Sequence, residues 1–399
     1  MTDTPVMPVH MQRVGFDPPP ELARLRADEG VLEVVTPFGP HAWLVTRYDD
    51  VRMVLSDPER FSNARTDFPF AGQLQLSREE IAQRRAGQLL AMDPPEHTRL
   101  RRMLTPEFTV RRIRRLAPRI EEIVDSHLDA IEKEGPPADL VSEFALPIPS
   151  LVICELLGVP YSEREQFQRR TRKQLDLSVP MPERLQLQRE SRTFMEEQVA
   201  RATAAPGDDM LGMLIREHGD ELTNDALVGV ALLLLVAGHE TTANMLGLGT
   251  LALLRHPEQL AAVRDDPAAV EPAVEELLRW LSIVPQGILR TTTTEVTLAG
   301  QTIPAGELVA VSLLAADRDP ALVEDPDRFD TTRGAMGHVA FGHGLHHCLG
   351  APLARMEMRT AFPALLRRFP ELDLAVPFEE VPFRPHHFIH GLQSLPVTW

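Results

Sequence analysis

Cys348 is the residue whose surroundings point most clearly to chemistry. It lies in residues 338–350, where Gly342, Gly344 and Gly350 let backbone amides approach the sulfur and adopt dihedral angles closed to other residues. An apolar pattern on helical spacing follows, so we expect the thiol near a helix N-terminus, whose partial positive charge favours the thiolate. A thiolate held in such a loop can bind iron.

Two other interpretations of Cys348 stay open at this point. Most cysteines outside disulfides are small buried hydrophobic residues, and without the glycines this interpretation would be preferred. A zinc site built from His343, His346, His347 and Cys348 is the third. Zinc sites usually take ligands from two separated pairs, and no second pair stands out in the sequence, so zinc ranks below iron.

An acid and an alcohol stand side by side within the long apolar helix pattern of residues 224–255. Glu240 and Thr241 belong to the run Ala-Gly-His-Glu-Thr-Thr at residues 237–242. Gly238 weakens an α-helix and Thr241 competes for backbone hydrogen bonds, so a local bulge with room for a small ligand is expected. Such a pair can carry protons to a bound molecule. Taken alone, the motif also fits a polar kink in a core helix.

Glu276 and Arg279 place opposite charges three residues apart on one helical face. Such a pair is usually an ordinary surface ion pair that adds little stability. By itself it therefore carries no functional prediction.

The composition limits the classes of protein. The chain has 399 residues, 43% of them hydrophobic, which is enough for a large core, and no linker divides it. A net charge of −17 argues against nucleic acid as a partner, and two cysteines fit a reducing cytoplasm. The longest apolar run, residues 226–238, is shorter than the ~20 residues that cross a bilayer. We expect a cytoplasmic protein without a membrane span.

One segment breaks the acidic trend, because eight arginines lie between residues 99 and 119. Most charge runs are solvated helix faces. The alternative is a basic dock for an acidic protein or for acidic groups of a cofactor. Arg102 and Arg112 would belong to such a dock.

The periodicity predicts a mainly α fold with small β-sheets. Alternation predicts a hairpin over residues 31–48 and short strands over residues 283–311. Helical spacing dominates residues 97–255 and returns over residues 257–280.

Two irregular segments are expected near a ligand. Residues 61–92 show little regular structure apart from a capping box at Ser77, and such segments are commonly functional loops. A second capping box, at Ser162, opens two helices over residues 162–203, separated by a proline-rich break. We expect this helix pair to form a lid.

The run Phe341-Gly342-x-Gly344-x-His346-x-Cys348-x-Gly350 resembles the haem-binding loop of cytochrome P450. The acid-alcohol motif and the Glu-x-x-Arg pair fall where that family has its other two motifs. The resemblance covers the whole chain and is strongest to the actinobacterial subfamily that hydroxylates vitamin D, statin precursors and polyketide macrolides. It implies one domain over residues 1–399, a triangular prism of about a dozen helices with haem between the central helix and the cysteine-loop helix at residues 338–355.

The resemblance also implies roles for individual residues. Glu240 and Thr241 would supply protons during oxygen activation, and Cys348 would bind the iron. Glu276 and Arg279, joined by Arg328 from a later loop, would stabilise the cysteine loop. Asp317, where relatives usually have Asn, is expected to affect packing only. The residues implied to bind the haem are His97, Arg101, Ala237, Arg290, Phe341, His346, Cys348 and Gly350.

The substrate pocket is expected where the irregular loop, the lid, the central helix and the end of the chain meet. Its walls are mostly apolar, which suggests a bulky, largely apolar molecule. The candidate positions are Leu177, Val179, Met181, Leu233, Ala237, Ile288, Phe388 and Ile389.

The function implied is a monooxygenase that inserts one oxygen atom of O2 into a C–H bond of a bulky, mostly apolar secondary metabolite or xenobiotic of the statin, secosteroid or macrolide type. It would use haem b (iron protoporphyrin IX), with electrons from NAD(P)H. No flavin or nicotinamide motif and no cysteines for an iron-sulfur cluster are present, so an acidic ferredoxin and its reductase are expected as partners of a monomer. A peroxide-driven haem peroxygenase and a non-catalytic haem sensor or carrier remain as alternatives.

Overall fold

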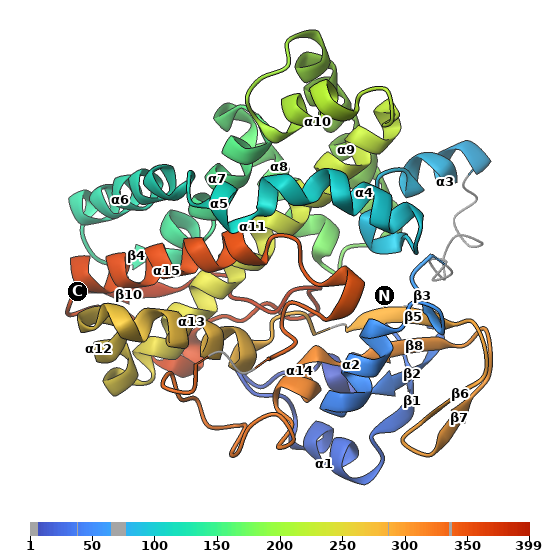
Figure 1. The fold of residues 1–399 in the computed structure, drawn as a ribbon. Helices are drawn as coiled ribbons and strands as arrows, with labels where there is room; N and C mark the ends of the chain where they lie inside the picture. Colours follow the sequence, from blue (N-terminus) through green and yellow to red (C-terminus); the bar gives the residue numbers. More distant parts are fainter. Residues whose placement is uncertain (1–6, 38, 65–76, 286, 335–336) are drawn as a thin grey trace. The chain divides into compact units, whose positions relative to one another are not determined.

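The structure, a computed structural model, describes residues 7–37, 39–64, 77–285, 287–334 and 337–399 and is mainly helical with short strands (Figure 1). The expected fold class, mainly α with small β-sheets, is confirmed. The chain divides into two compact units. The sheet unit comprises residues 1–75, 255–349 and 388–391, and the helical unit comprises residues 76–254, 350–387 and 392–399. A single domain over residues 1–399 stays a prediction.

The sheet unit contains a five-stranded sheet in the order β1-β2-β8-β5-β3. Its strands are β1 (Val31–Val35), β2 (His41–Val45), β3 (Phe61–Ser62), β5 (Ile288–Thr292) and β8 (Leu308–Val311). β1 and β2 form the expected hairpin, with Val31 opposite Val45, and β8 runs parallel to β2. A second hairpin joins β6 (Val296–Leu298) and β7 (Gln301–Ile303). β-branched residues supply much of the core against this sheet.

The helices of the sheet unit are α1 (Pro20–Asp28), α2 (Tyr48–Ser56), α12 (Pro257–Asp265), α13 (Pro267–Leu281) and α14 (Leu313–Asp317), with 3-10 turns at Val9–Met11 and Gly344–His346. Asp266 begins α13 because its side chain accepts a hydrogen bond from the Ala268 amide. The last turns of α13 are buried, including the charged residues Glu276 and Arg279. This helix therefore carries a polar cluster inside the unit.

The helical unit is arranged around α11 (Asn224–Leu254). Its other helices are α3 (Arg78–Arg85), α4 (Glu96–Leu104), α5 (Val110–Ile113), α6 (Ala117–Glu134), α7 (Pro147–Leu157), α8 (Arg164–Leu175), α9 (Met181–Ala204), α10 (Met210–His218) and α15 (Ala351–Arg368). Five short turns complete it, at Leu89–Ala91, Thr105–Phe108, Val141–Ala145, Tyr161–Glu163 and Phe378–Glu380. A small sheet has the order β4 (Ala138–Asp139), β10 (Pro396–Thr398) and β9 (Asp373–Leu374).

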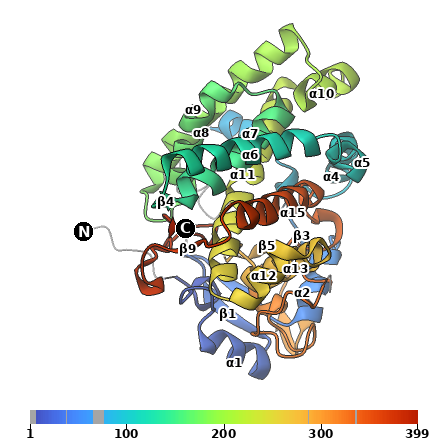
Figure 2. The same ribbon diagram turned by 90° about the vertical axis from the view of Figure 1, so that its left-hand side faces the viewer.

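α11 is apolar around most of its circumference, as expected of a helix inside a core. It packs on α7 and on α15, and α15 in turn packs on α6 (Figures 1 and 2). Gly238 permits the close approach of α7, because a Cβ at this position would lie 2.6 Å from Ile153 Cδ1. Within the described residues α11 alone is long and apolar enough to cross a membrane, and 56% of its most apolar window is buried. A core helix has the same composition, so this is weak evidence for a span.

Three local expectations can be compared with the structure. The capping box at Ser77 is present at the start of α3. The capping box at Ser162 is wrong, because Ser162 lies inside the 3-10 turn Tyr161–Glu163 and α8 begins at Arg164 without a side-chain cap. The bulge in α11 is also absent, because the helix stays α-helical while Thr241 Oγ1 donates to the Ala237 carbonyl at 2.8 Å. Part of the expected substrate loop, residues 65–76, lies outside the described residues.

Candidate active site

The cysteine loop is shaped by two glycines with left-handed backbone angles. Gly342 and Gly344 have φ of 73° and 71°, and a Cβ on Gly344 would lie 2.5 Å from the Leu55 carbonyl oxygen. The Cys348 amide donates to the Phe341 carbonyl at 2.8 Å, which closes the loop. Cys348 is exposed. An accessible sulfur at the end of a constrained loop can act as a metal ligand.

Glu276 and Arg279 form a fully buried, bidentate ion pair. Arg279 Nε lies 2.7 Å from Glu276 Oε2 and Arg279 Nη2 lies 2.8 Å from Glu276 Oε1, and both side chains are 0% exposed. Arg279 Nη1 also donates at 2.8 Å to the carbonyls of Asp317 and Pro326. The pair therefore joins α13 to two later segments, and it is not the surface pair that its spacing alone suggested.

The expectation that the Arg328 side chain joins this pair is wrong. Arg328 is 66% exposed and faces Asp330 at 3.7 Å, and only its backbone carbonyl accepts from Arg279, at 3.4 Å. The second arginine at the pair is Arg333, whose Nε lies 3.6 Å from Glu276 Oε1 with the side chain 14% exposed. The chain turns between these two arginines, so only the later one points inward.

The start of the cysteine loop is held by two buried acids. His338 Nε2 lies 3.1 Å from Glu275 Oε2, beside Glu276 on α13. The Val339 amide donates to Asp317 Oδ1 at 2.7 Å. Burial raises the pKa of Asp317 to about 6. Glu275 and His338 were missed by the sequence reasoning, and Asp317 binds the loop backbone in addition to packing.

Each unit supplies two of the expected basic partners for haem carboxylates. In the sheet unit, Arg290 on β5 is buried, and His346 Nε2 lies 2.7 Å from the Asn63 amide nitrogen. In the helical unit, His97 is fully buried and Arg101 follows one turn later on the same face of α4. Asn63, which orients His346, was not predicted. A polar residue directly after β3 was the signal for it.

The middle of α11 retains accessible surface that includes one apolar row of residues. Leu233, Ala237 and Thr241 retain accessible surface and are spaced by four residues, so they lie on one side of the helix. Leu235, His239 and Glu240 are buried. The row is apolar with the Thr241 hydroxyl at one end, which is suited to an apolar ligand next to a polar reaction.

Glu240 is a buried acid whose Oε2 atom has two partners. Arg384 Nη1 and Asn244 Nδ2 each lie 3.3 Å from it, and the Glu240 and Arg384 side chains are 1% and 8% exposed. Burial raises the pKa of Glu240, but His239, Arg384, His387 and Arg172 together outweigh that effect and hold the pKa below its usual value. Arg384 and Asn244 were missed. An arginine in the apolar segment near the chain end was the available signal.

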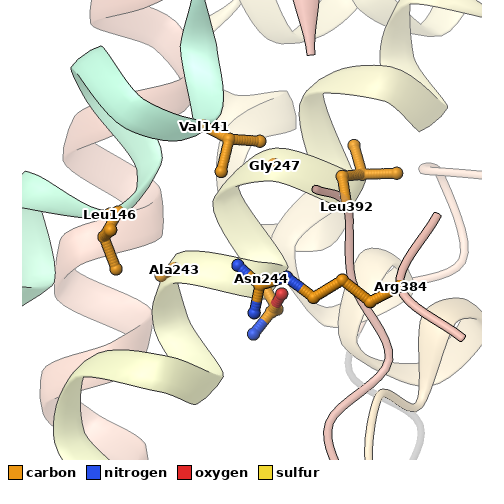
Figure 3. Close-up of a pocket in the computed structure, with 7 residues that line it drawn as sticks. All are labelled: Val141, Leu146, Ala243, Asn244, Gly247, Arg384 and Leu392. Carbon is orange, nitrogen blue, oxygen red and sulfur yellow. The ribbon is translucent and has the colours of Figure 1, made fainter. Parts of the chain in front are cut away.

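A small cavity adjoins these two partners of Glu240. Figure 3 shows the Asn244 and Arg384 side chains next to each other at its edge. Its volume of about 10 Å³ is close to that of a single water molecule. The wall consists of Val141, Leu146, Ala243, Asn244, Gly247, Arg384 and Leu392.

The candidate substrate residues are divided between the units. Those in the helical unit are Leu177, Val179, Met181, Leu233 and Ala237, and those in the sheet unit are Ile288, Phe388 and Ile389. The connection between α8 and α9 is fixed to the chain's later segment, because the Leu177 amide donates to the His386 carbonyl at 2.8 Å. Each of these positions stays a prediction.

The predicted residues are divided between the two units. The sheet unit holds Cys348 with Phe341, His346, Arg290 and the Glu276 pair. The helical unit holds Glu240 and Thr241 with Ala237, His97 and Arg101, and Gly350 lies there directly before α15. The donor chemistry fits a haem, since it includes an accessible thiol for iron and basic side chains for carboxylates.

The chain belongs to the cytochrome P450 family. Residues 184–387 match the family model described as Cytochrome P450. The chain is 50% identical to Cytochrome P450 FAS1 of Rhodococcoides fascians, with 100% of both chains covered, and 43% identical to Vitamin D(3) 25-hydroxylase of Pseudonocardia autotrophica, covering 96% of this chain and 94% of the relative. The crystal structure of CYP105P1 in complex with filipin I is 42% identical, with a TM-score of 0.92 over 100% of this chain and 99% of that one.

Membership defines the class of enzyme. The protein is an oxidoreductase that incorporates oxygen from O2, with haem b as cofactor and reductase-supplied NAD(P)H as electron source. Bacterial members generally bind small molecules and take electrons from a ferredoxin and its reductase. Of the interpretations of Cys348, the haem ligand is the one that this family supports.

Proposed function

We propose that this chain hydroxylates a bulky, mostly apolar secondary metabolite or xenobiotic of the statin, secosteroid or macrolide type, in the cytoplasm. The observation that carries the proposal is the accessible apolar row of α11, where Leu233 and Ala237 lead to Thr241. Relatives named for vitamin D hydroxylation and a neighbour solved with filipin I support this size and polarity of substrate.

In this proposal the chain's residues hold the cofactor and handle protons. Cys348 is the iron ligand, and His97, Arg101, Arg290 and His346 hold the propionates. Haem with a thiolate ligand supplies the chemistry that cleaves the O–O bond and oxidises a C–H bond. Thr241 positions a proton beside the accessible row, and the neighbouring buried acid Glu240 supplies it.

A ligand panel tests the substrate class. The ferric protein is titrated with statins, secosteroids and macrolides while the iron spin state is followed by absorbance. We expect micromolar binding, roughly −8 kcal/mol, to at least one class. No spectral change with any class would refute the subfamily assignment. Product formation with ferredoxin, reductase and NAD(P)H, compared with peroxide alone, then separates a monooxygenase from a peroxygenase and from a haem sensor or carrier.

The first variant experiment concerns the acid and the alcohol. We expect Glu240→Gln and Thr241→Ala each to lower product formed per NAD(P)H by roughly 10-fold or more, because positioned acids and bases contribute about 10²–10⁴-fold. Hydrogen peroxide should rise by the amount that product falls. Thr242→Ala, one residue further along α11, is the matched control. If the amount of product formed per NAD(P)H is unchanged in both variants, Glu240 and Thr241 do not supply protons.

The second variant experiment concerns the binding of ferredoxin. Arg102, Arg111, Arg114 and Arg115 are exposed, and no ion pair to these four is seen within the described part of the helical unit. Arg112 differs, because its Nε lies 2.8 Å from Glu107 Oε2. The unpaired arginines are therefore better candidates for an acidic partner than Arg112.

We expect the double variant Arg102→Glu, Arg115→Glu to raise the KM for ferredoxin about 10-fold at low salt, with a smaller difference at high salt. Arg169→Glu is the control, since Arg169 is 70% exposed and lies on α8. A KM that does not respond to the double charge reversal would show that ferredoxin docks elsewhere.

A further inference from the structure

His239 is a fully buried histidine beside the proposed proton-supplying acid. Its Nδ1 lies 2.6 Å from the Leu235 carbonyl oxygen, one helical turn earlier. Because a carbonyl can only accept, Nδ1 carries a hydrogen and Nε2 is the atom that binds or releases a further proton. Nε2 is buried and has no hydrogen-bond partner among the residues that the structure describes.

The atom opposite Nε2 is Oε1 of Glu240. It is also buried, no hydrogen-bond partner for it is found in the described ranges, and it lies 4.0 Å from Nε2. The other oxygen of the carboxylate is held by Arg384 and Asn244. Glu240 is thus anchored through Oε2 with Oε1 directed at His239. Two lone pairs facing each other in a buried site are unfavourable unless a proton lies between them.

We propose that His239 stores a proton at Nε2 and passes it to Oε1 of Glu240 during turnover. The inference rests on the proposed function, in which Glu240 supplies protons. In the transfer the Nε2–H bond breaks, its electron pair remains on the ring, and an O–H bond forms at Oε1. The ring becomes neutral and is recharged by a proton from solvent, the source of the protons that monooxygenation consumes. His239 is a positioning residue that acts through Glu240.

The surroundings of His239 favour release of a proton from Nε2. Burial lowers the pKa of His239 and the Glu240 carboxylate opposes that shift, so a proton on Nε2 is held weakly and depends on the acid. The other charged groups that face the pair are Arg172 on α8 and Arg384 and His387 from the later segment. Transfer requires the 4.0 Å gap between Nε2 and Oε1 to shorten to a hydrogen bond of about 3 Å.

A purely structural role is the competing explanation. The His239 ring packs edge-on against Phe167, with centroids 5.2 Å apart, and its Nδ1 bond could simply satisfy the helix interior. His127 on α6 provides a matched control, because its Nδ1 makes the same bond to a carbonyl four residues earlier, Ile123, at 2.7 Å. His127 is only partly buried.

The first test compares His239→Gln with His127→Gln in the haem-loaded enzyme. In His239→Gln we expect product per NAD(P)H to fall about 10-fold, with a larger solvent isotope effect on kcat and unchanged substrate Kd and ferrous carbon-monoxide spectrum. His127→Gln should match the unmodified enzyme. Normal coupling in a folded His239→Gln overturns the inference. If Glu240→Gln also couples normally, the proposed function has failed instead.

The second test does not require turnover. A variant at position 239 is used only to assign the His239 signals. The histidine nitrogens are followed by 15N NMR against pH in the ferrous carbon-monoxide form, with and without Glu240→Gln. Glu240→Gln removes the negative charge that favours the protonated ring. The midpoint of the titration of the Nε2 signal should therefore move to lower pH by about one unit. The same midpoint in both proteins overturns the inference.

Discussion

Replacing Cys348 by Ser should abolish the absorption band that thiolate ligation gives to the ferrous carbon-monoxide complex. A serine oxygen does not donate electron density to iron as a thiolate does, so cleavage of the O–O bond loses its main support. We expect product formation to fall by roughly 100-fold or more, since even a lost partner behind a metal ligand costs about 10–100-fold. An unchanged spectrum would refute the assignment of the ligand.

Cys154 supplies the matched control for this experiment. It is fully buried on α7, and burial raises the pKa of its thiol to about 12, so it is a neutral hydrophobic side chain at any working pH. Cys154→Ala should keep the spectrum and coupling while losing some stability. If Cys154→Ala removed the band and Cys348→Ser kept it, Cys154 and not Cys348 would be assigned as the iron ligand.

Regular elements were predictable from the sequence where one physical signal dominates. Alternation predicted the β1–β2 hairpin, and a long apolar run predicted α11. The capping pair at Ser162 failed although its spacing is correct, because the preceding chain forms a 3-10 turn and puts the serine inside it. The spacing of two residues does not determine the backbone conformation of the chain that precedes a helix.

The motif residues of the candidate site could be predicted from the sequence, but the residues that pair with them could not. Spacing placed Glu240 and Thr241 on one helix, but Arg384, which pairs with Glu240, comes from a segment 144 residues away. The error over Arg328 has the same cause. Two arginines five residues apart are equally suitable in sequence, and only the turn of the backbone decides that Arg333 points at Glu276.

The pair of Glu276 and Arg279 gives the largest expected effect on stability. Glu276→Gln leaves the Arg279 guanidinium buried at 0% exposure without its bidentate carboxylate partner. Breaking a buried pair on one side costs about 3–5 kcal/mol, which is a large part of the ~5–15 kcal/mol that stabilises a typical domain. We expect a much lower midpoint of thermal unfolding, measured together with faster loss of haem from the Cys348 loop.

Two further variants make this result specific to the geometry. Arg328→Gln should change stability by less than about 1 kcal/mol, because that side chain is 66% exposed and faces Asp330 at the surface. Arg333→Gln should be clearly more destabilising, since Arg333 is 14% exposed and lies 3.6 Å from Glu276. A larger loss in Arg328→Gln than in Arg333→Gln would contradict the observed pairing and restore the arrangement expected from the family. The ranking of the two losses of stability is therefore more informative than the size of either loss.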